Sequence, residues 1–573
     1  MEYRRFIIIA ALAVVTYSLF LQWKNDYHDG ENKRTTNNTV ASIETFNESN
    51  SSISNQSYNN SVSNEQDSQK NLLNSDLPTA EVEEENVLIK EEPTKNYQVI
   101  TVKTDVVEYK INPIGGDFYG INLLEYLDAL DNPDLTFSLL ENNSHRTYIA
   151  QSGLIGLNGP DASKEGRPHY KVEKNTFELG DNDSLEVVLT AYQGDVEIRK
   201  ILTFFKGQYK INVNYEINNQ SEQDWKGNLF GQIKRDNSSV PGEVDLTFGL
   251  KPFLGGAYWT EDKAYNKLRF HDFEKDQVKE KVTGGWAAIV QHYFVSGWIP
   301  DPELSHTYTT RINNKNENII GFTSQSLTVQ PGETGKISSS FYAGPKIIDK
   351  LKAVSPGFDL TLDLGWLWMI SKLLIWGLDN IYNMVNNWGL SIIILTFFVK
   401  AIFIYPSAKS FKSMANMRRI QPEMQRLKDL HGDDRQKMSQ GMIELYKKEK
   451  VNPLGGCLPI LLQMPVFIAL YWALMESVQL RHSSFMFWID DLSVMDPYFV
   501  LPLIMGVSMF IQQSLNPTPP DPMQAKVMKM MPIMFTFFFL WFPAGLVLYW
   551  VVNNTLSIIQ QYIITKRIEA GEH

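Results

Sequence analysis

A single lysine inside an apolar run is the residue whose type and position most directly imply chemistry. Residues 391–406 read Ser-Ile-Ile-Ile-Leu-Thr-Phe-Phe-Val-Lys-Ala-Ile-Phe-Ile-Tyr-Pro, with the lysine at position 400. A cation inside a membrane helix is costly, so Lys400 is a candidate functional residue. The alternative is a lysine that snorkels to nearby headgroups, because Pro406 lies about 9 Å further along a helix.

Polar side chains in the other apolar runs could accompany this charge. Thr396 precedes Lys400 by four residues and shares its helix face. The further candidates are Gln463, Ser508, Gln512, Gln513, Asn553, Asn554, Gln560 and Gln561. Each alone is more typical of a hydrogen bond between helices than of contact with another polypeptide. Glu476, near the end of its run, is interpreted as interfacial.

Motifs for bond-making chemistry are missing from the sequence. It contains no P-loop, no H-E-x-x-H and no G-x-S-x-G, and Cys457 is its only cysteine. An intrachain disulfide is therefore impossible. We predict no catalytic residue, no metal site and no cofactor.

The apolar runs predict a polytopic α-helical membrane protein with six transmembrane helices. Arg4 and Arg5 precede the first run, which favours an uncleaved anchor, although a cleavable signal peptide is the alternative. The runs 498–513 and 528–542 are shorter than the roughly 17–25 residues of a usual span, so the bilayer there must thin or flanking residues must snorkel. The predicted spans are residues 1–23, 389–406, 454–480, 498–513, 528–542 and 545–564.

Two regions between the first and second spans differ sharply in composition. Residues 24–98 are rich in Asn, Ser, Gln and Glu and poor in aromatic residues, which predicts a disordered polar and acidic tether. From 99 to 345, short alternating runs are separated by turn residues, as in 209–217 and 336–343. This pattern predicts a large β-sandwich domain.

Two helical segments flank the second span. Apolar residues recur every three to four positions between 357 and 388, with tryptophans nearby, which predicts an amphipathic helix along the membrane surface or a tilted extension of the span. Residues 407–453 predict a solvated hairpin of two helices, 414–431 and 435–450.

Basic residues in the loops predict the orientation. Segment 407–453 carries eleven basic and six acidic residues, a net charge of +5, and is therefore placed in the cytoplasm. The loop 481–497 has one Arg and three Asp and belongs on the other side. Arg4, Arg5, Lys566 and Arg567 place both termini in the cytoplasm, so the β-domain is extracytoplasmic.

Several motifs, in this order and spacing, resemble the YidC/Oxa/Alb family of membrane protein insertases, in its long Gram-negative form. They lie within about 357–567, whereas the N-terminal part is similar in architecture. The motifs are Lys-Val-Asn-Pro-Leu-Gly-Gly-Cys-Leu-Pro (450–459), Leu-Gln-Met-Pro-Val-Phe (462–467), Trp-Ile-Asp-Asp-Leu (488–492), Asp-Pro-Tyr (496–498), Pro-Ile-Met-Phe-Thr (532–536) and Phe-Pro-Ala-Gly-Leu-Val-Leu-Tyr-Trp (542–550).

The resemblance implies a function in which no covalent bond is made or broken. In such proteins five spans form the insertase core around a hydrophilic groove with one positive charge, usually Arg, where this chain has Lys400. Lys keeps the attraction to a carboxylate but loses the bidentate fork. The residues expected to contact the polypeptide being inserted are Lys400, Thr396, Gln463, Gln512, Asn553, Tyr549 and Trp550, and those expected on the cytoplasmic hairpin are Arg418, Arg419 and Lys437.

The same resemblance implies partners: nascent membrane proteins, membrane lipid, the Sec translocon, and ribosome or targeting machinery at the hairpin, with no direct nucleic-acid contact. The tail 565–573 is weakly basic, which disfavours a tail-mediated ribosome contact. Mid-span aromatics such as Tyr549 and Trp550 are more often lipid-facing or core residues, and cations such as those of the hairpin are more typical of a solvated surface than of dedicated contacts.

Three other functions compete with an insertase. A secondary transporter would usually show two similar halves, and no repeat is found. A membrane-anchored glycan-active protein would need two suitably spaced carboxylates in the β-domain. An intramembrane protease would need a nucleophile or metal motif.

Overall fold

The structure is a computed structural model that describes residues 76–78, 98–164, 166–241, 252–275, 277–431, 434–449, 451, 458–516 and 522–570. The predicted anchor at 1–23 and most of the predicted tether lie outside the described residues. So do residues 452–457 of the first family-like motif, including Cys457.

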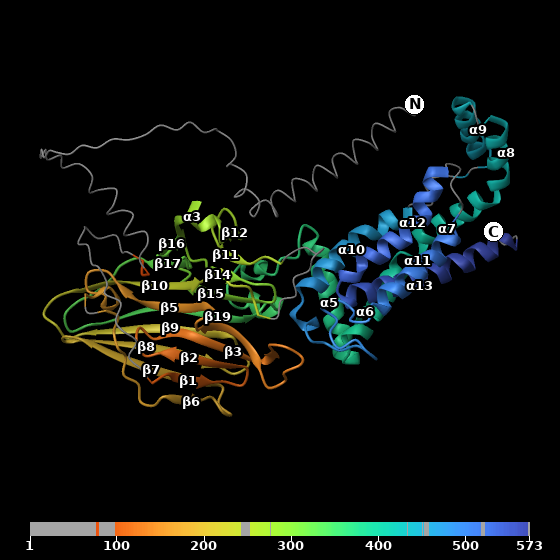
Figure 1. Ribbon diagram of the computed structural model, residues 1–573. Coiled ribbons are helices and arrows are strands. Elements are labelled where there is room, and N and C mark those ends of the chain that lie inside the picture. The colour runs from red at the N-terminus through yellow and green to blue at the C-terminus, as the bar shows by residue number, and fades with distance from the viewer. Residues whose placement is uncertain are drawn as a thin grey trace, which may run out of the picture. The chain divides into compact units, whose positions relative to one another are not determined.

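The described part of the region 99–345 folds into two antiparallel-rich β-sheets (Figure 1). One sheet has the order β13-β16-β17-β10-β5-β4-β3-β2-β1-β6, with β18 paired to β10, and the other β12-β11-β14-β15-β19-β9-β8-β7. The strands of the first are β1 (Ile100–Lys103), β2 (Val107–Asn112), β3 (Asp117–Leu127), β4 (Thr136–Asn142), β5 (Thr147–Ile155), β6 (Thr176–Glu178), β10 (Trp225–Arg235), β13 (Lys279–Thr283), β16 (Ser305–Ile312), β17 (Asn318–Ser324) and β18 (Leu327–Val329). Those of the second are β7 (Ser184–Gln193), β8 (Val196–Phe205), β9 (Lys210–Asn219), β11 (Gly255–Tyr258), β12 (Asn266–Arg269), β14 (Ala287–Val290), β15 (Phe294–Pro300) and β19 (Thr334–Pro345).

Strict alternation explains why these segments become strands. In β9 every second residue is buried, from Ile211 to Ile217, and the residues between them are half-exposed. Successive side chains of a strand point to opposite faces, so such a strand covers the core with one face. Phe118 of one sheet stacks on Phe341 of the other, with ring centroids 5.5 Å apart. The predicted β-sandwich is confirmed.

The C-terminal region is helical and differs from the predicted boundaries mainly after Lys400. Its principal helices are α4 (Ile348–Lys352), α5 (Trp368–Val385), α6 (Trp388–Ile402), α7 (Ile404–Arg419), α8 (Gln421–His431), α9 (Arg435–Lys448), α10 (Leu458–Glu476), α11 (Val500–Ser514), α12 (Pro522–Phe538) and α13 (Ala544–Glu569). The first hairpin helix begins at Gln421 rather than at Met414, because α7 continues to Arg419.

A bend follows Lys400 closely. Helices α6 and α7 meet at 69°, and Phe403 lies between them. Asn387 caps the start of α6 by accepting a hydrogen bond from the Leu390 amide at 2.9 Å. Within the described residues, no single helix has both the length and the hydropathy of a membrane span; α6 and α7 meet that requirement as a pair.

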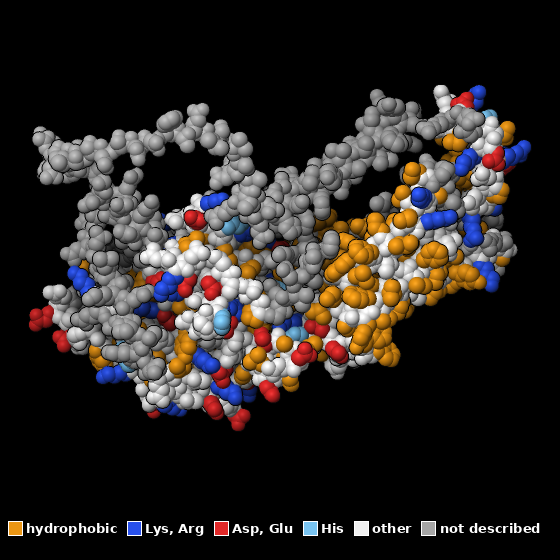
Figure 2. All heavy atoms as spheres, viewed as in Figure 1, with side chains coloured by type: hydrophobic (Ala, Val, Ile, Leu, Met, Phe, Trp, Pro, Cys, Tyr) orange, Lys and Arg blue, Asp and Glu red, His pale blue; other side chains and the backbone are white. Residues whose placement is uncertain are grey.

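Helix α5 has apolar residues on both of its faces. Leu374, Ile375 and Leu378 are buried against the protein. Trp368, Met369, Trp376 and Met384 are at least half exposed. Figure 2 shows hydrophobic side chains gathered over the helical region. An outward face of Trp and Met suits the headgroup boundary, and the surface location predicted for this helix remains a prediction.

The end of α10 is attached to the β-domain by buried polar contacts. Glu476 Oε2 lies 2.6 Å from Lys346 Nζ, and their side chains are 3% and 2% exposed. His292 Nε2 donates to the Met475 carbonyl at 2.9 Å. Burial lowers the pKa of His292 to about 3, and the Lys346 ammonium contributes, so the imidazole is neutral. Glu476, interpreted from sequence as interfacial, is enclosed by protein.

Candidate functional site

Lys400 lies near the C-terminal end of α6 and faces α13. Its side chain is 9% exposed, and Nζ donates to Ser557 Oγ at 2.6 Å. No salt bridge joins Lys400 to a carboxylate among the residues that the structure describes. A buried ammonium held by one neutral hydroxyl retains an unmet attraction for an anion.

Further polar side chains continue from Lys400 along α13 to α10 and α11. Asn553 Nδ2 donates to Gln463 Oε1 at 3.4 Å, and Asn554 Nδ2 donates to Ser508 Oγ at 3.2 Å. Ser557 Oγ donates to the Asn553 carbonyl at 2.7 Å. We call the following set the polar seam: Lys400, Gln463, Ser508, Asn553, Asn554 and Ser557.

Spacing along α13 explains why one helix supplies half of this seam. Asn553, Ser557 and Gln561 are each four residues apart and share a face. Gln561 donates to the Leu515 carbonyl at 3.3 Å and to Asn516 Oδ1 at 3.0 Å. The three side chains therefore contact α10, α6 and the residues just after α11, in that order.

Two of the predicted groove residues stay apart from these contacts. Thr396 is 1% exposed, and its hydroxyl donates to the Ile392 carbonyl of its own helix at 2.6 Å. Gln512 is half-buried on α11. The structure gives neither side chain a hydrogen bond to Lys400 among the described residues.

The aromatic pair lies one to two turns before the seam on α13. Tyr549 is 2% exposed and belongs to the helical core. Trp550 packs edge-on against Phe467 of α10, with centroids 4.6 Å apart, and its buried Nε1 has no acceptor in the described part of the chain. Both residues therefore pack between α10 and α13, and the indole N–H of Trp550 is able to donate a hydrogen bond to a bound polypeptide.

Sequence reasoning missed Ser557 and Ser407. Ser557 could have been found, because it repeats the four-residue spacing of Asn553 and Gln561. Ser407, on α7, is 2% exposed, and its hydroxyl has no partner within the described regions. Its signal was hidden because the preceding Pro406 suggested the end of the span.

The cytoplasmic hairpin candidates are solvent-facing. Arg418, Arg419 and Lys437 are exposed. Arg419 lies 3.7 Å from Glu449, and Lys437 lies 3.3 Å from Asp434. A small apolar cluster that includes Met417, Ile420 and Met424 holds this region together. These cations are accessible to a partner, but the described residues of the hairpin form no defined binding site for one.

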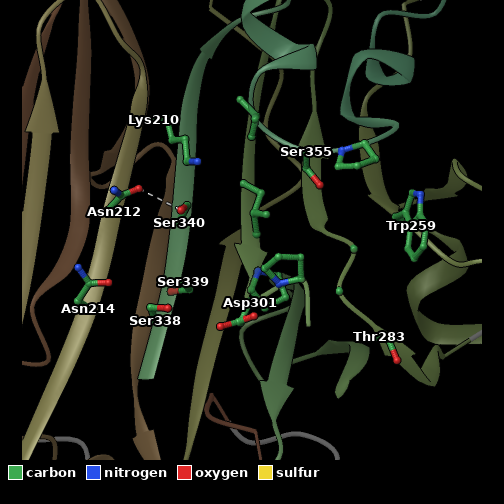
Figure 3. Close-up of a pocket in the computed structure, with 17 residues that line it drawn as sticks. Lys210, Asn212, Asn214, Trp259, Thr283, Asp301, Ser338, Ser339, Ser340 and Ser355 are labelled. Atoms are coloured by element: carbon green, nitrogen blue, oxygen red, sulfur yellow. Dashed lines mark hydrogen bonds between the residues drawn. The ribbon is translucent and has the colours of Figure 1, made fainter. Parts of the chain in front are cut away.

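A separate cavity of about 470 Å³ opens on the β-domain (Figure 3). Asn212, Asn214, Ser338 and Ser340 line one wall from neighbouring strands β9 and β19, and Ser340 Oγ donates to Asn212 Oδ1 at 3.2 Å. Trp259 lies on another wall. Asp301 is the one carboxylate among the described lining residues, so this cavity lacks the carboxylate pair that glycoside hydrolysis uses.

Comparison with known proteins matches the β-domain and the helical region each to a family model. The family model described as YidC periplasmic domain matches residues 99–377, and the one described as 60Kd inner membrane protein matches 380–571. The protein named membrane protein insertase YidC from Marinomonas sp. (strain MWYL1) is 50% identical over 99% of this chain and 100% of its own length. The chain belongs to the YidC family. It is therefore a bacterial inner-membrane protein with a periplasmic β-domain.

A second YidC relative has a similar extent. The membrane protein insertase YidC of Pseudomonas putida (strain W619) is 49% identical over 100% of this chain and 99% of its own. A crystal structure described as an active YidC insertase with the first transmembrane domain resolved matches 82% of this chain and 93% of that chain, with 18% identity and a TM-score of 0.36.

Proposed function

We propose that this chain is a membrane protein insertase, as its YidC relatives are named, and that the polar seam receives the hydrophilic segment of the protein being inserted. That protein is called the client below. The observation that carries the proposal is Lys400, a buried cation whose one hydrogen bond in the described structure goes to the neutral Ser557. Family membership supports the insertase activity, and the contacts of Lys400 support its role.

Capture of the client begins with an exchange of partners at Lys400. A carboxylate in the client's hydrophilic stretch replaces Ser557 Oγ as the acceptor, because a full negative charge attracts the Lys400 ammonium more strongly than a neutral hydroxyl does. Ser557 then retains its bond to the Asn553 carbonyl. The amides of Gln463, Asn553 and Asn554 offer further hydrogen bonds to the client backbone.

Short helices reduce the distance that the polar stretch must cross. Helices α6 and α11 have 15 residues each. That corresponds to about 22 Å of helix, against about 30 Å for an average hydrocarbon core. Local thinning of the bilayer around them lowers the cost of moving the hydrophilic segment.

Apolar side chains on α12 supply a route into lipid for the rest of the client. Val527, Met530, Ile533 and Phe537 are between 56% and 67% exposed. They recur at three- and four-residue intervals and so form one face. A client helix that leaves this face for lipid gains about 0.8 kcal/mol per buried CH₂ relative to water.

Topology and partners follow as parts of the same proposal. Six spans with both termini in the cytoplasm agree with the distribution of basic residues in the loops. The exposed Lys and Arg residues of the hairpin could bind ribosome or targeting machinery. The Sec translocon is proposed as a partner of the periplasmic domain and the membrane helices. Lys437 and Arg418 are exposed and could serve the cytoplasmic contact.

Placing a carboxylate beside Lys400 should block binding of the client to the polar seam, because the new carboxylate occupies the cation. In Ser557→Asp, the new side chain pairs with the Nζ that Ser557 now binds at 2.6 Å, and it competes with the client. We expect insertion of a client with an acidic tail to fall at least tenfold in membrane vesicles, measured by protease protection of the tail. Ser557→Asn, similar in size but uncharged, is the matched control and should lose less than threefold. Equal insertion by both variants would contradict carboxylate capture.

A further inference from the structure

Three residues of the predicted disordered tether are held on the periplasmic domain. The Asp76 carbonyl accepts hydrogen bonds from Gln232 Nε2 at 2.7 Å and from Arg311 Nη2 at 3.1 Å. These donors come from β10 and β16, more than 150 residues away in the sequence. Asp76–Pro78 therefore differs from the predicted tether, because specific partners offset the entropy of ordering it.

The Asp76 carboxylate has two further partners. Asn313 Nδ2 donates to Oδ1 at 2.5 Å, and Lys234 Nζ lies 3.2 Å from Oδ2. Burial alone would raise the pKa of Asp76, but the Lys234 charge and the Asn313 hydrogen bond outweigh it, so the pKa is lowered. The site thus favours an ionised aspartate.

Leu77 occupies an apolar recess beside these polar groups. It is 7% exposed and packs with Ile155 of β5 and Phe230 of β10, next to Ala162. Asp76 and Leu77 lie at a bend in the chain, and their side chains contact different residues, so they use two different subsites. The recess accepts an aliphatic side chain immediately after an acidic one.

The side chains that hold Asp76 are buried and are also hydrogen-bonded to one another. Gln232, Arg311, Asn313 and Lys234 are each more than nine-tenths buried. Gln232 Nε2 also donates to Gln151 Oε1 at 2.9 Å, and Arg311 Nη2 donates to Gln232 Oε1 at 2.5 Å. A face with so many buried polar groups requires partners for them, and Asp76 supplies several.

We propose that this surface is a binding site for an Asp-Leu peptide, and that the chain's own Asp76–Pro78 is its resident ligand. The site, which we call the tether latch, fixes one point of the segment between the anchor and the β-domain. It lies on β5, β10 and β16 and does not depend on the insertase proposal. A segment of another protein with the same acidic and aliphatic pair would have to displace the tether.

The deciding experiment measures access to Leu77 in the full-length protein. In a Cys457→Ser background, Leu77→Cys should react with a maleimide at least tenfold more slowly in the native than in the denatured protein. Adding Asp76→Asn and Asn313→Ala should raise the native rate at least fivefold. Tyr192→Cys, at a residue 63% exposed on β7, controls for reagent access and should not respond to those changes. Native labelling of Leu77→Cys as fast as in denaturant would overturn the latch.

A peptide in trans tests the selectivity of the site. A fluorescent peptide of residues 71–82 should bind the Asp76→Asn/Leu77→Ala protein at least tenfold more tightly than the wild type, whose own segment competes at an effective concentration of about millimolar. The same peptide carrying the two substitutions should lose at least tenfold in affinity. Equal binding of both peptides would contradict recognition of the Asp-Leu pair.

Discussion

Replacing Lys400 with glutamate should abolish growth of a bacterium depleted of its own YidC protein, whereas replacing it with arginine should permit growth. Lys400→Ala removes the buried cation, and Lys400→Glu repels an acidic client tail. A unit charge pair at 4 Å is worth up to about 4 kcal/mol at an effective dielectric of about 20. We therefore expect insertion of a Sec-independent client with an acidic tail to fall between tenfold and several hundredfold.

The matched control for this prediction is a charge change outside the seam. Lys412 is exposed on α7, one helix further along the chain. Lys412→Glu should leave insertion within twofold of wild type, with all variants compared at equal protein levels. If Lys400→Ala, Lys400→Glu and Lys400→Arg all insert the client like wild type, Lys400 is a snorkelling anchor and the charge mechanism fails.

Of the substitutions proposed for this protein, those that break the ion pair between Lys346 and Glu476 should cause the largest loss of stability. Its atoms are 2.6 Å apart, and both side chains are almost fully buried. Removing one partner of such a pair leaves a charge buried without compensation and typically costs about 3–5 kcal/mol. Glu476→Gln and Lys346→Met should each lower the thermal midpoint of the detergent-purified protein by several degrees.

Two comparisons separate this effect from a general loss of charge. Lys336 and Glu216 also lie 2.6 Å apart, but the lysine side chain is 72% exposed. Lys336→Met should therefore cost about 1 kcal/mol or less. The double variant Lys346→Met/Glu476→Leu replaces the pair with apolar groups and should recover most of the lost stability. A midpoint unchanged in both single variants would show that the pair does not join α10 to the β-domain.

The alternation of buried and exposed residues within a strand could be predicted from the sequence, whereas the contacts between distant segments could not. The run at 209–217 predicted β9 nearly residue by residue, because burial of every second side chain is a local property. The partner of Lys400 lies 157 residues away, and that of Glu476 lies 130 residues away. Local patterns carry no information on which helix will face which.

Composition misled the prediction at the tether for a similar reason. The segment around Asp76 has too few apolar residues to fold alone, so disorder was the correct expectation for its local sequence. Leu77 is nevertheless buried, since β5 and β10 provide the recess. The bend after Ile402 was missed as well, because the apolar run continues through Tyr405 while the helix axis turns by 69°.

Cross-linking of a stalled client to the polar seam tests whether Lys400 holds the client's acidic tail. In the Cys457→Ser background, a cysteine is placed at Ser557, which binds Lys400, or at Ile559, which is 50% exposed two residues later on α13. The ribosome-bound client carries one cysteine in its acidic tail. We expect a disulfide cross-link to position 557 at least tenfold more often than to 559, and its loss in Lys400→Glu. Cross-links that are equal at both positions, or confined to 559, would contradict a client held at Lys400.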